Sequence, residues 1–227
     1  MKTKGLDSTV IKIVAIICMF IDHLAASWIE GGLQYYPMFT IPYWVMRFIG
    51  RVSFPIFCFF IVEGFFKTRC RWKYALRLLC FALISEVPFD LAMFGTAFYW
   101  GYQNVFFTLF LGLLVIWASD EVIKKKWYFL ILPIVAAGMA AAWFGMTDYD
   151  WMGIVAIFIL YILGKKRIAA VIVCCVFLTL MNPLEITCAL CIPLLLNYNG
   201  QRGRGFKYFF YAFYPAHLLI LGLLKVL

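Results

Sequence analysis

The sequence predicts an all-α integral membrane protein, a polytopic bundle of about nine transmembrane helices. Of its 227 residues, 66% are apolar and 14% are charged, compared with about 45–50% and about 25% in soluble domains. Aromatic residues make up 20% of the chain, and Trp and Tyr collect at membrane interfaces. A soluble chain of this size would still need a polar surface. The solvent around much of this surface must therefore be lipid.

Apolar segments recur along the whole chain and predict its spanning helices. A helix needs about 20 mostly apolar residues to cross the hydrocarbon core. The segments in chain order are 9–29, 45–66, 73–94, 104–119, 128–146, 151–164, 168–181, 184–197 and 208–226. Those between 151 and 197 are short, so the sequence leaves open whether they are full spans or re-entrant helices. No linker interrupts the series, and we expect a single transmembrane helical domain over 1–227.

Basic residues alternate between the loops and predict the orientation. The loops after the second, fourth, sixth and eighth segments carry Lys67, Arg69, Arg71 and Lys73; Lys124, Lys125 and Lys126; Lys165, Lys166 and Arg167; and Arg202, Arg204 and Lys207. The loops between them carry no lysine or arginine. The positive-inside rule then predicts a cytoplasmic N-terminus, an external C-terminus and a multi-pass location in a cytoplasmic (inner or plasma) membrane. Because the net charge of +9 is spread over these loops, nucleic-acid binding is excluded.

The cysteines do not predict a metal site. Cys188 and Cys191 form a CxxC motif, but neither a second pair nor a histidine lies nearby in the sequence. Most of the other cysteines lie inside apolar segments, where thiols pack as small hydrophobic groups. We expect no bound metal.

Charged residues inside the apolar segments point to function, because each costs roughly 2.5–3.5 kcal/mol on insertion scales. Arg47 and Arg51 are four residues apart and share a helix face, as do Glu86 and Asp90. If their helices are antiparallel, Arg47 lies level with Asp90 and Arg51 with Glu86. These pairs are either structural ion pairs that fix the helix register or parts of a polar site.

The only two histidines, His23 and His217, both lie within apolar segments. A histidine in a helix is more often a satisfied structural residue, but two intramembrane histidines favour function. Asp22 precedes His23 directly, so the two side chains point about 100° apart and Asp22 does not orient the imidazole. Further polar residues expected at the outer side are Gln103, Asn104, Thr108, Asp148 and Asp150. Together these residues predict a polar, outward-facing cavity, which fits an enzyme or a transporter.

A series of short motifs spans almost the whole chain. In order they are Asp22-His23-Leu24, Arg47-x-x-Gly50-Arg51-x-x-Phe54-Pro55-Ile56-Phe57, Glu63-Gly64-Phe65-x-x-Thr68, Tyr74-x-x-Arg77-Leu78, Ser85-Glu86-x-Pro88-Phe89-Asp90, Asn104-x-x-Phe107-Thr108-Leu109, Tyr149-Asp150-Trp151-x-Gly153 and Tyr214-Pro215-x-His217. This series resembles the TraX family of membrane proteins, named for acetylation of the N-terminus of conjugative F-pilin. The histidine in the first helix is also weakly similar to that of the acyltransferase-3 and heparan-type transmembrane acetyltransferases.

The resemblance implies an acetyltransferase that moves an acetyl group from cytoplasmic acetyl-CoA to an amine or hydroxyl at the outer face. A peptide N-terminus, an amino sugar or an envelope polymer could be the acceptor. The implied catalytic residues are His23 as the base, Glu86 as its orienting partner, Arg51 or Asn104 near the oxyanion, and His217 near the thioester. Whether His23 or His217 is the base stays open.

The other implied site residues line the cavity or meet the cofactor. The cavity residues are Asp22, Arg47, Asp90, Asn104, Thr108, Asp150 and Tyr214, and the residues for the phosphates of CoA are Lys67, Arg71 and Arg77. The expected partners are acetyl-CoA, an extracytoplasmic peptide or glycan, and the lipid bilayer; homo-oligomerisation stays open. Two alternatives remain: a transporter or flippase for a small anionic metabolite, bound by Arg47 and Arg51, and a non-catalytic assembly factor. No internal repeat supports the transporter.

Overall fold

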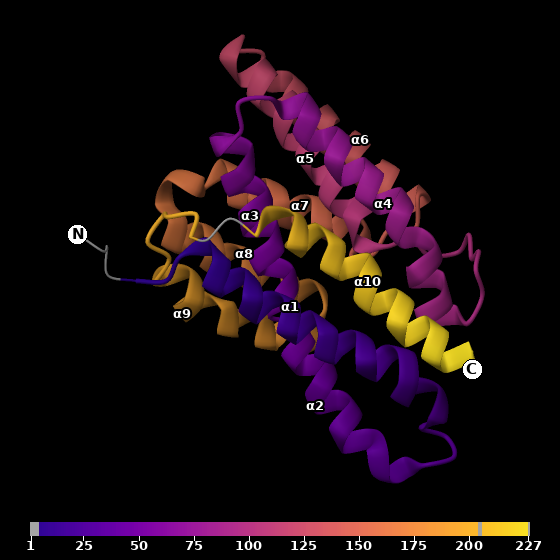
Figure 1. Cartoon of the computed structure of the whole chain (residues 1–227). Coiled ribbons are helices and arrows are strands. Elements are labelled where there is room, and N and C mark those ends of the chain that lie inside the picture. Colours follow the sequence, from indigo (N-terminus) through magenta and orange to yellow (C-terminus); the bar gives the residue numbers. More distant parts are fainter. Residues whose placement is uncertain (1–4, 204–205, 227) are drawn as a thin grey trace. The chain divides into compact units, whose positions relative to one another are not determined.

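The computed structural model describes residues 5–203 and 206–226, and these residues are helical apart from their connections (Figure 1). No β-strand occurs among them; two isolated bridges join Leu6 to Tyr198 and Gln103 to Thr147. The predicted all-α class is confirmed. Arg204, which the sequence assigned to a cytoplasmic loop, lies outside the described residues.

Each apolar segment of the sequence corresponds to helical structure. The α-helices are α1 (Ser8–Leu24), α2 (Thr40–Gly50), α3 (Ser53–Lys67), α4 (Arg71–Phe94), α5 (Val105–Lys124), α6 (Ile131–Phe144), α7 (Asp150–Ile162), α8 (Arg167–Met181), α9 (Cys191–Leu196) and α10 (Lys207–Val226). The segment expected at 45–66 begins earlier and consists of two helices, α2 and α3, separated by Arg51 and Val52. The segment expected at 184–197 is a 3₁₀ helix (Pro183–Leu190) followed by α9.

Four continuous helical stretches among the described residues are long and apolar enough to cross a membrane. They are Ser8–Gly32, Pro37–Lys67, Val105–Lys124 and Tyr208–Lys225, and shorter apolar helices cover Tyr128–Phe144, Asp150–Ile162 and Pro183–Leu196. The chain is thus a helical membrane protein. The number of spans and the orientation stay predictions.

The helices group into two compact units. The first consists of Met1–Phe57, Val87–Phe98 and Cys175–Leu227, and the second of Cys58–Glu86 and Tyr99–Cys174. The boundaries between the units fall inside α3, α4 and α8.

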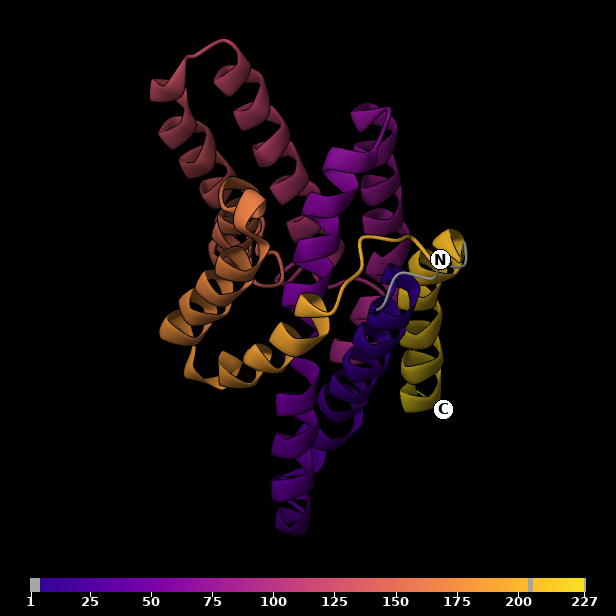
Figure 2. The same ribbon diagram turned by 90° about the vertical axis from the view of Figure 1, so that its left-hand side faces the viewer.

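In the first unit, α1 packs against both α2 and α10, and Figures 1 and 2 show α1 and α10 side by side. Asp7 caps the N-terminus of α1 by accepting hydrogen bonds from two backbone N–H groups of the first turn. A π-helix, Ala25–Ile29, continues α1, and π-helical turns are frequent at functional sites. Gly50 lets α2 approach α1 closely, because a Cβ at this position would lie 2.3 Å from the Cβ of Asp22.

In the second unit, α5, α6 and α7 pack against one another. Their core contains Val115, Ala142 and Ile154. Gly138 brings α6 close to α5, because a Cβ there would lie 2.2 Å from a methyl carbon of Val115. Small residues at such contacts are typical of helix packing in membranes.

Candidate functional site

The two histidines form a pair within the first unit. His23 on α1 and His217 on α10 are in hydrogen-bond contact, with 2.7 Å between His23 Nδ1 and His217 Nε2. The two rings are nearly parallel, at 3°. The Tyr214 ring packs edge-on against both, with centroid distances of 5.7 Å. Tyr214, which the sequence assigned to the expected cavity, is therefore part of the histidine site. Residues 194 positions apart in the chain thus meet because α10 packs along α1.

The second nitrogen of His217 determines where the protons of the neutral pair lie. His217 Nδ1 is 2.7 Å from the carbonyl oxygen of Phe213, which can only accept a hydrogen bond. Nδ1 of His217 must then carry the proton, and its Nε2 accepts from Nδ1–H of His23. This assignment leaves a lone pair on His23 Nε2, which can therefore act as a base.

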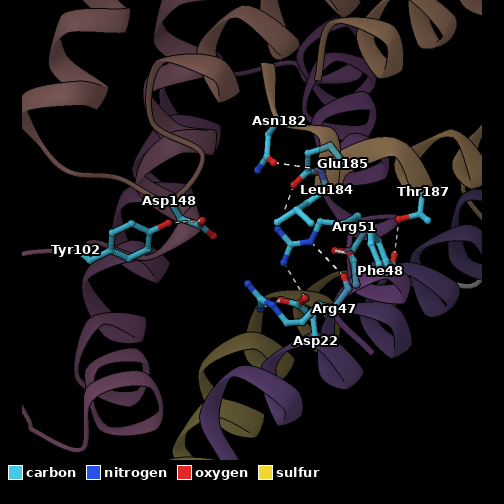
Figure 3. Close-up of polar contacts among 12 residues, drawn as sticks. Asp22, Arg47, Phe48, Arg51, Tyr102, Asp148, Asn182, Leu184, Glu185 and Thr187 are labelled. Atoms are coloured by element: carbon cyan, nitrogen blue, oxygen red, sulfur yellow. Dashed lines mark hydrogen bonds and ion pairs between the residues drawn. The ribbon is translucent and has the colours of Figure 1, made fainter. Parts of the chain in front are cut away.

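A largely buried network of four charged residues lies in the same unit, and it includes Asp22, the neighbour of His23 in the chain (Figure 3). Asp22 accepts from Arg47 Nη1 and Arg51 Nη2, each at 2.8 Å. Arg51 Nη1 also contacts Glu185 Oε1 at 3.1 Å. Two guanidinium groups and two carboxylates balance in charge, as buried ions require.

These contacts test two expectations about α1 and α2. The prediction that Asp22 does not orient His23 is confirmed, because the carboxylate of Asp22 faces the arginines. The predicted pairing of Arg47 with Asp90 is wrong. The helix opposite Arg47 is α1, brought close by Gly50, so Asp22 is its carboxylate partner.

Glu185 is a network residue that sequence reasoning missed. It lies in the 3₁₀ helix Pro183–Leu190, is 3% exposed, and its backbone N–H donates to Asn182 O. Thr187 in the same helix donates to the backbone carbonyl of Phe48 on α2 at 2.7 Å. The signal that could have identified Glu185 from the sequence is its position as an acidic residue within an apolar segment.

Asp90 is buried near the end of α4, at 1% exposure. Close by in the chain, the Ala92 carbonyl accepts from Ser27 Oγ of the π-helix at 2.6 Å and from Lys225 Nζ of α10 at 3.1 Å. These bonds hold the end of α4 against α1 and α10 within the first unit.

The remaining polar residues expected near the outer side lie in the second unit. Asn104 caps α5: its Oδ1 accepts from Phe106 N at 3.0 Å, and its Nδ2 donates to Ala82 O at 2.8 Å and to Glu86. Glu86 is thus held by an asparagine, and its expected pairing with Arg51 of the first unit stays a prediction. Thr108 donates to the backbone oxygen of Asp148.

Asp150 begins α7 with a positive φ of 41°, and Tyr149 before it has φ of 61°. The Asp150 carboxylate accepts from the backbone N–H of Trp151. Positive φ is uncommon outside glycine and is often found near functional sites.

The three residues expected to bind CoA phosphates also lie in the second unit. Lys67 pairs with Glu63 at 2.6 Å, and Arg71 contacts Asp120 at 2.7 Å. Arg77 lies over the ring of Tyr74, 5.5 Å from its centroid. A phosphate would compete with carboxylates for Lys67 and Arg71, so cofactor binding here stays a prediction.

Chemically, the first unit offers a proton acceptor and guanidinium donors in an apolar setting. Among the described residues, no group of three or more His, Cys, Asp or Glu side chains could hold a metal ion. The histidine pair suits proton transfer, and the arginines suit stabilisation of negative charge.

The fold and its polar residues define a helical membrane protein with a histidine pair between two helices that are long and apolar enough to cross a membrane. The chain belongs to the TraX family, whose model, described as TraX protein, matches residues 7–225. This confirms the resemblance seen in the motifs.

Two curated proteins are similar to the chain. A probable fimbrial assembly protein FimC, serogroup H1, of Dichelobacter nodosus is 31% identical over 93% of this chain and 92% of that protein. An uncharacterized protein, RP591, of Rickettsia prowazekii (strain Madrid E) is 27% identical over 77% of this chain and 67% of that protein. No solved structure matches the chain significantly.

Proposed function

We propose that the protein is a membrane-embedded acyltransferase that acetylates a subunit of an envelope fibre. Acetyl-CoA is the donor, and an amine of the fibre subunit, at the outer face, is the acceptor. Two findings support this proposal: membership of the TraX family and the similarity to a relative named as a probable fimbrial assembly protein.

The observation that carries the proposal is the chain of hydrogen bonds from His23 through His217 to the Phe213 carbonyl. It leaves the lone pair of His23 on Nε2. It also holds the ring in one orientation, as the third group of a catalytic triad does for its histidine.

The transfer proceeds by general base catalysis. His23 Nε2 removes a proton from the acceptor nitrogen as that nitrogen attacks the carbonyl carbon of the acetyl thioester. A C–N bond forms, and the carbonyl oxygen becomes negatively charged. The C–S bond then breaks, and the proton on His23 passes to the CoA thiolate, which leaves as the thiol. Positioned acid–base catalysis of this kind contributes about 10²–10⁴-fold.

His217 stabilises the protonated state of His23. Once Nε2 of His23 carries the proton, its Nδ1–H donates a charge-assisted hydrogen bond to the neutral His217 Nε2, and such bonds are stronger than neutral ones. His217 is therefore a positioning residue in this mechanism, and His23 is the base.

Purified protein, labelled acetyl-CoA and a peptide amine test the proposal. His23→Ala should lose at least about 10²-fold in turnover while it still folds and binds acetyl-CoA. His217→Ala should lose less, and His217→Gln should recover part of that loss, because an amide oxygen can still accept from His23. Normal turnover by His23→Ala would exclude the histidine mechanism. If the wild type transfers no acetyl group to any amine, the proposed activity is wrong, and transport of a small anion becomes the leading hypothesis.

A further inference from the structure

We infer that Arg47, and not Arg51, donates hydrogen bonds to the acetyl oxygen as it becomes negatively charged. This inference rests on the proposed acyl transfer and gives a catalytic role to a residue that the sequence placed only in the cavity. It follows from counting which donors of the buried network are already in use.

Arg51 has its three side-chain nitrogens engaged within the first unit. Nε donates to the Arg47 backbone oxygen at 3.2 Å, Nη1 to Glu185 and Nη2 to Asp22. Its side chain is 15% exposed. A residue held from three sides positions its neighbours, and it could meet an incoming oxygen only by giving up one of these bonds.

Arg47 is different. Within the part of the chain that the structure describes, its side chain makes one hydrogen bond, from Nη1 to Asp22 Oδ2. A guanidinium group has five N–H donors, so Nε and Nη2 remain available. The Arg47 side chain is also the more open of the two, at 26% exposure. Its donors are pre-oriented, because Asp22 holds one side of the planar group.

Arg47 is also anchored close to the base along α1. Its anchor, Asp22, is the residue directly before His23 on that helix, so the guanidinium group is bound within one residue of the base. The acceptor nitrogen attacks the acetyl carbonyl while it gives its proton to His23 Nε2. The carbonyl oxygen would thus become negatively charged near a guanidinium group with free donors. Removing one oxyanion donor typically costs about 10²–10³-fold in turnover.

The other oxyanion candidate of the sequence, Asn104, does not offer the same capacity. Its amide nitrogen already donates to Ala82 O and to Glu86, and its oxygen caps α5. Asn104 is accounted for as a helix cap.

The test compares Arg47→Lys with Arg51→Lys in the acetylation assay. Lysine keeps the positive charge near Asp22 but loses the planar fork of donors. Arg47→Lys should lower kcat about 10²-fold with little change in KM and in melting temperature. Its affinity for a tetrahedral phosphonate analogue of the intermediate should fall by the same factor, whereas acetyl-CoA binding should not change. Arg51→Lys should lower the melting temperature and affect substrate and analogue binding equally.

Chemical rescue provides a second measurement, which can be interpreted even if the variant is partly destabilised. Methylguanidinium added to Arg47→Ala should restore part of the turnover, and it should not restore Arg51→Ala. Wild-type kcat and analogue affinity in Arg47→Lys would overturn the inference while leaving the acyltransferase intact. The inference would also be overturned if Arg47→Lys lost affinity only for vesicles that contain anionic lipid. Arg47 would then bind a lipid phosphate. A wild type without transferase activity would dismiss both proposals together.

Discussion

The two units each contain an arginine bound by two carboxylates, but the surroundings of the two arginines differ. In the first unit, Arg51 contacts Asp22 and Glu185, whose side chains are 13% and 4% exposed. In the second, Arg71 contacts Asp120, whose side chain is 15% exposed, and Glu121, whose side chain is 48% exposed. Lys124, one turn further along α5, pairs with the same two acids at 55% exposure.

The difference shows that an ion pair has to be judged by its burial. An exposed pair is screened by water and contributes little. In a buried network, each remaining charge loses its partner when one member is removed, and that loss is costly. The first network is therefore expected to hold α1, α2 and the 3₁₀ helix Pro183–Leu190 together. In the second network, the exposed members Glu121 and Lys124 should tolerate substitution.

The largest effect is expected for Asp22→Ala. It removes the carboxylate shared by Arg47 and Arg51, so the free energy of unfolding should fall by roughly 3–5 kcal/mol. Chemical unfolding in detergent measures this change. Glu121→Ala serves as the exposed counterpart, and equal losses in the two variants would contradict the comparison.

Gly50→Ala is expected to have the next largest effect. The new methyl group would lie 2.3 Å from Asp22 Cβ, so α1 and α2 must separate at a cost of about 1–3 kcal/mol. Gly31→Ala is the matched control, because a Cβ there meets nothing within 4 Å. If both variants unfold alike, the close contact at Gly50 is not needed to hold the network.

A smaller effect is expected for Thr187→Val, which removes the hydrogen bond to the Phe48 carbonyl but keeps the shape of the side chain. One hydrogen bond contributes about 0.5–1.5 kcal/mol. Thr187→Ser keeps the hydroxyl and should unfold like the wild type. A loss in Thr187→Ser as large as in Thr187→Val would assign the effect to packing.

The smallest effect is expected for Glu121→Gln in the second unit. Because the Glu121 side chain is exposed, replacing its carboxylate by a neutral amide should change the free energy of unfolding by only about 0–1 kcal/mol. The change should shrink further as salt is added. A loss comparable with that of Asp22→Ala would show that exposure is a poor guide in this protein.

Much of the fold could be predicted from the sequence, because helix formation in lipid depends on local hydropathy. The predicted segment 73–94 corresponds to α4 (Arg71–Phe94), and 208–226 corresponds to α10 (Lys207–Val226). The divergence of Asp22 and His23 was also predictable, since neighbours on a helix point about 100° apart. The break between α2 and α3 was missed, although Gly50 and Pro55 flank it and residues of these types often mark helix ends.

The sequence by itself determined that the chain is a helical membrane protein, and that its histidines and arginines lie where charge is expensive. Only the tertiary structure decided which of these side chains meet. Hydropathy specifies that a helix is buried in lipid, but not which helix packs beside it or at what height. The contact of His23 with His217 follows from the packing of α1 against α10. The ion pair of Arg47 with Asp22 follows from the packing of α1 against α2, which Gly50 allows.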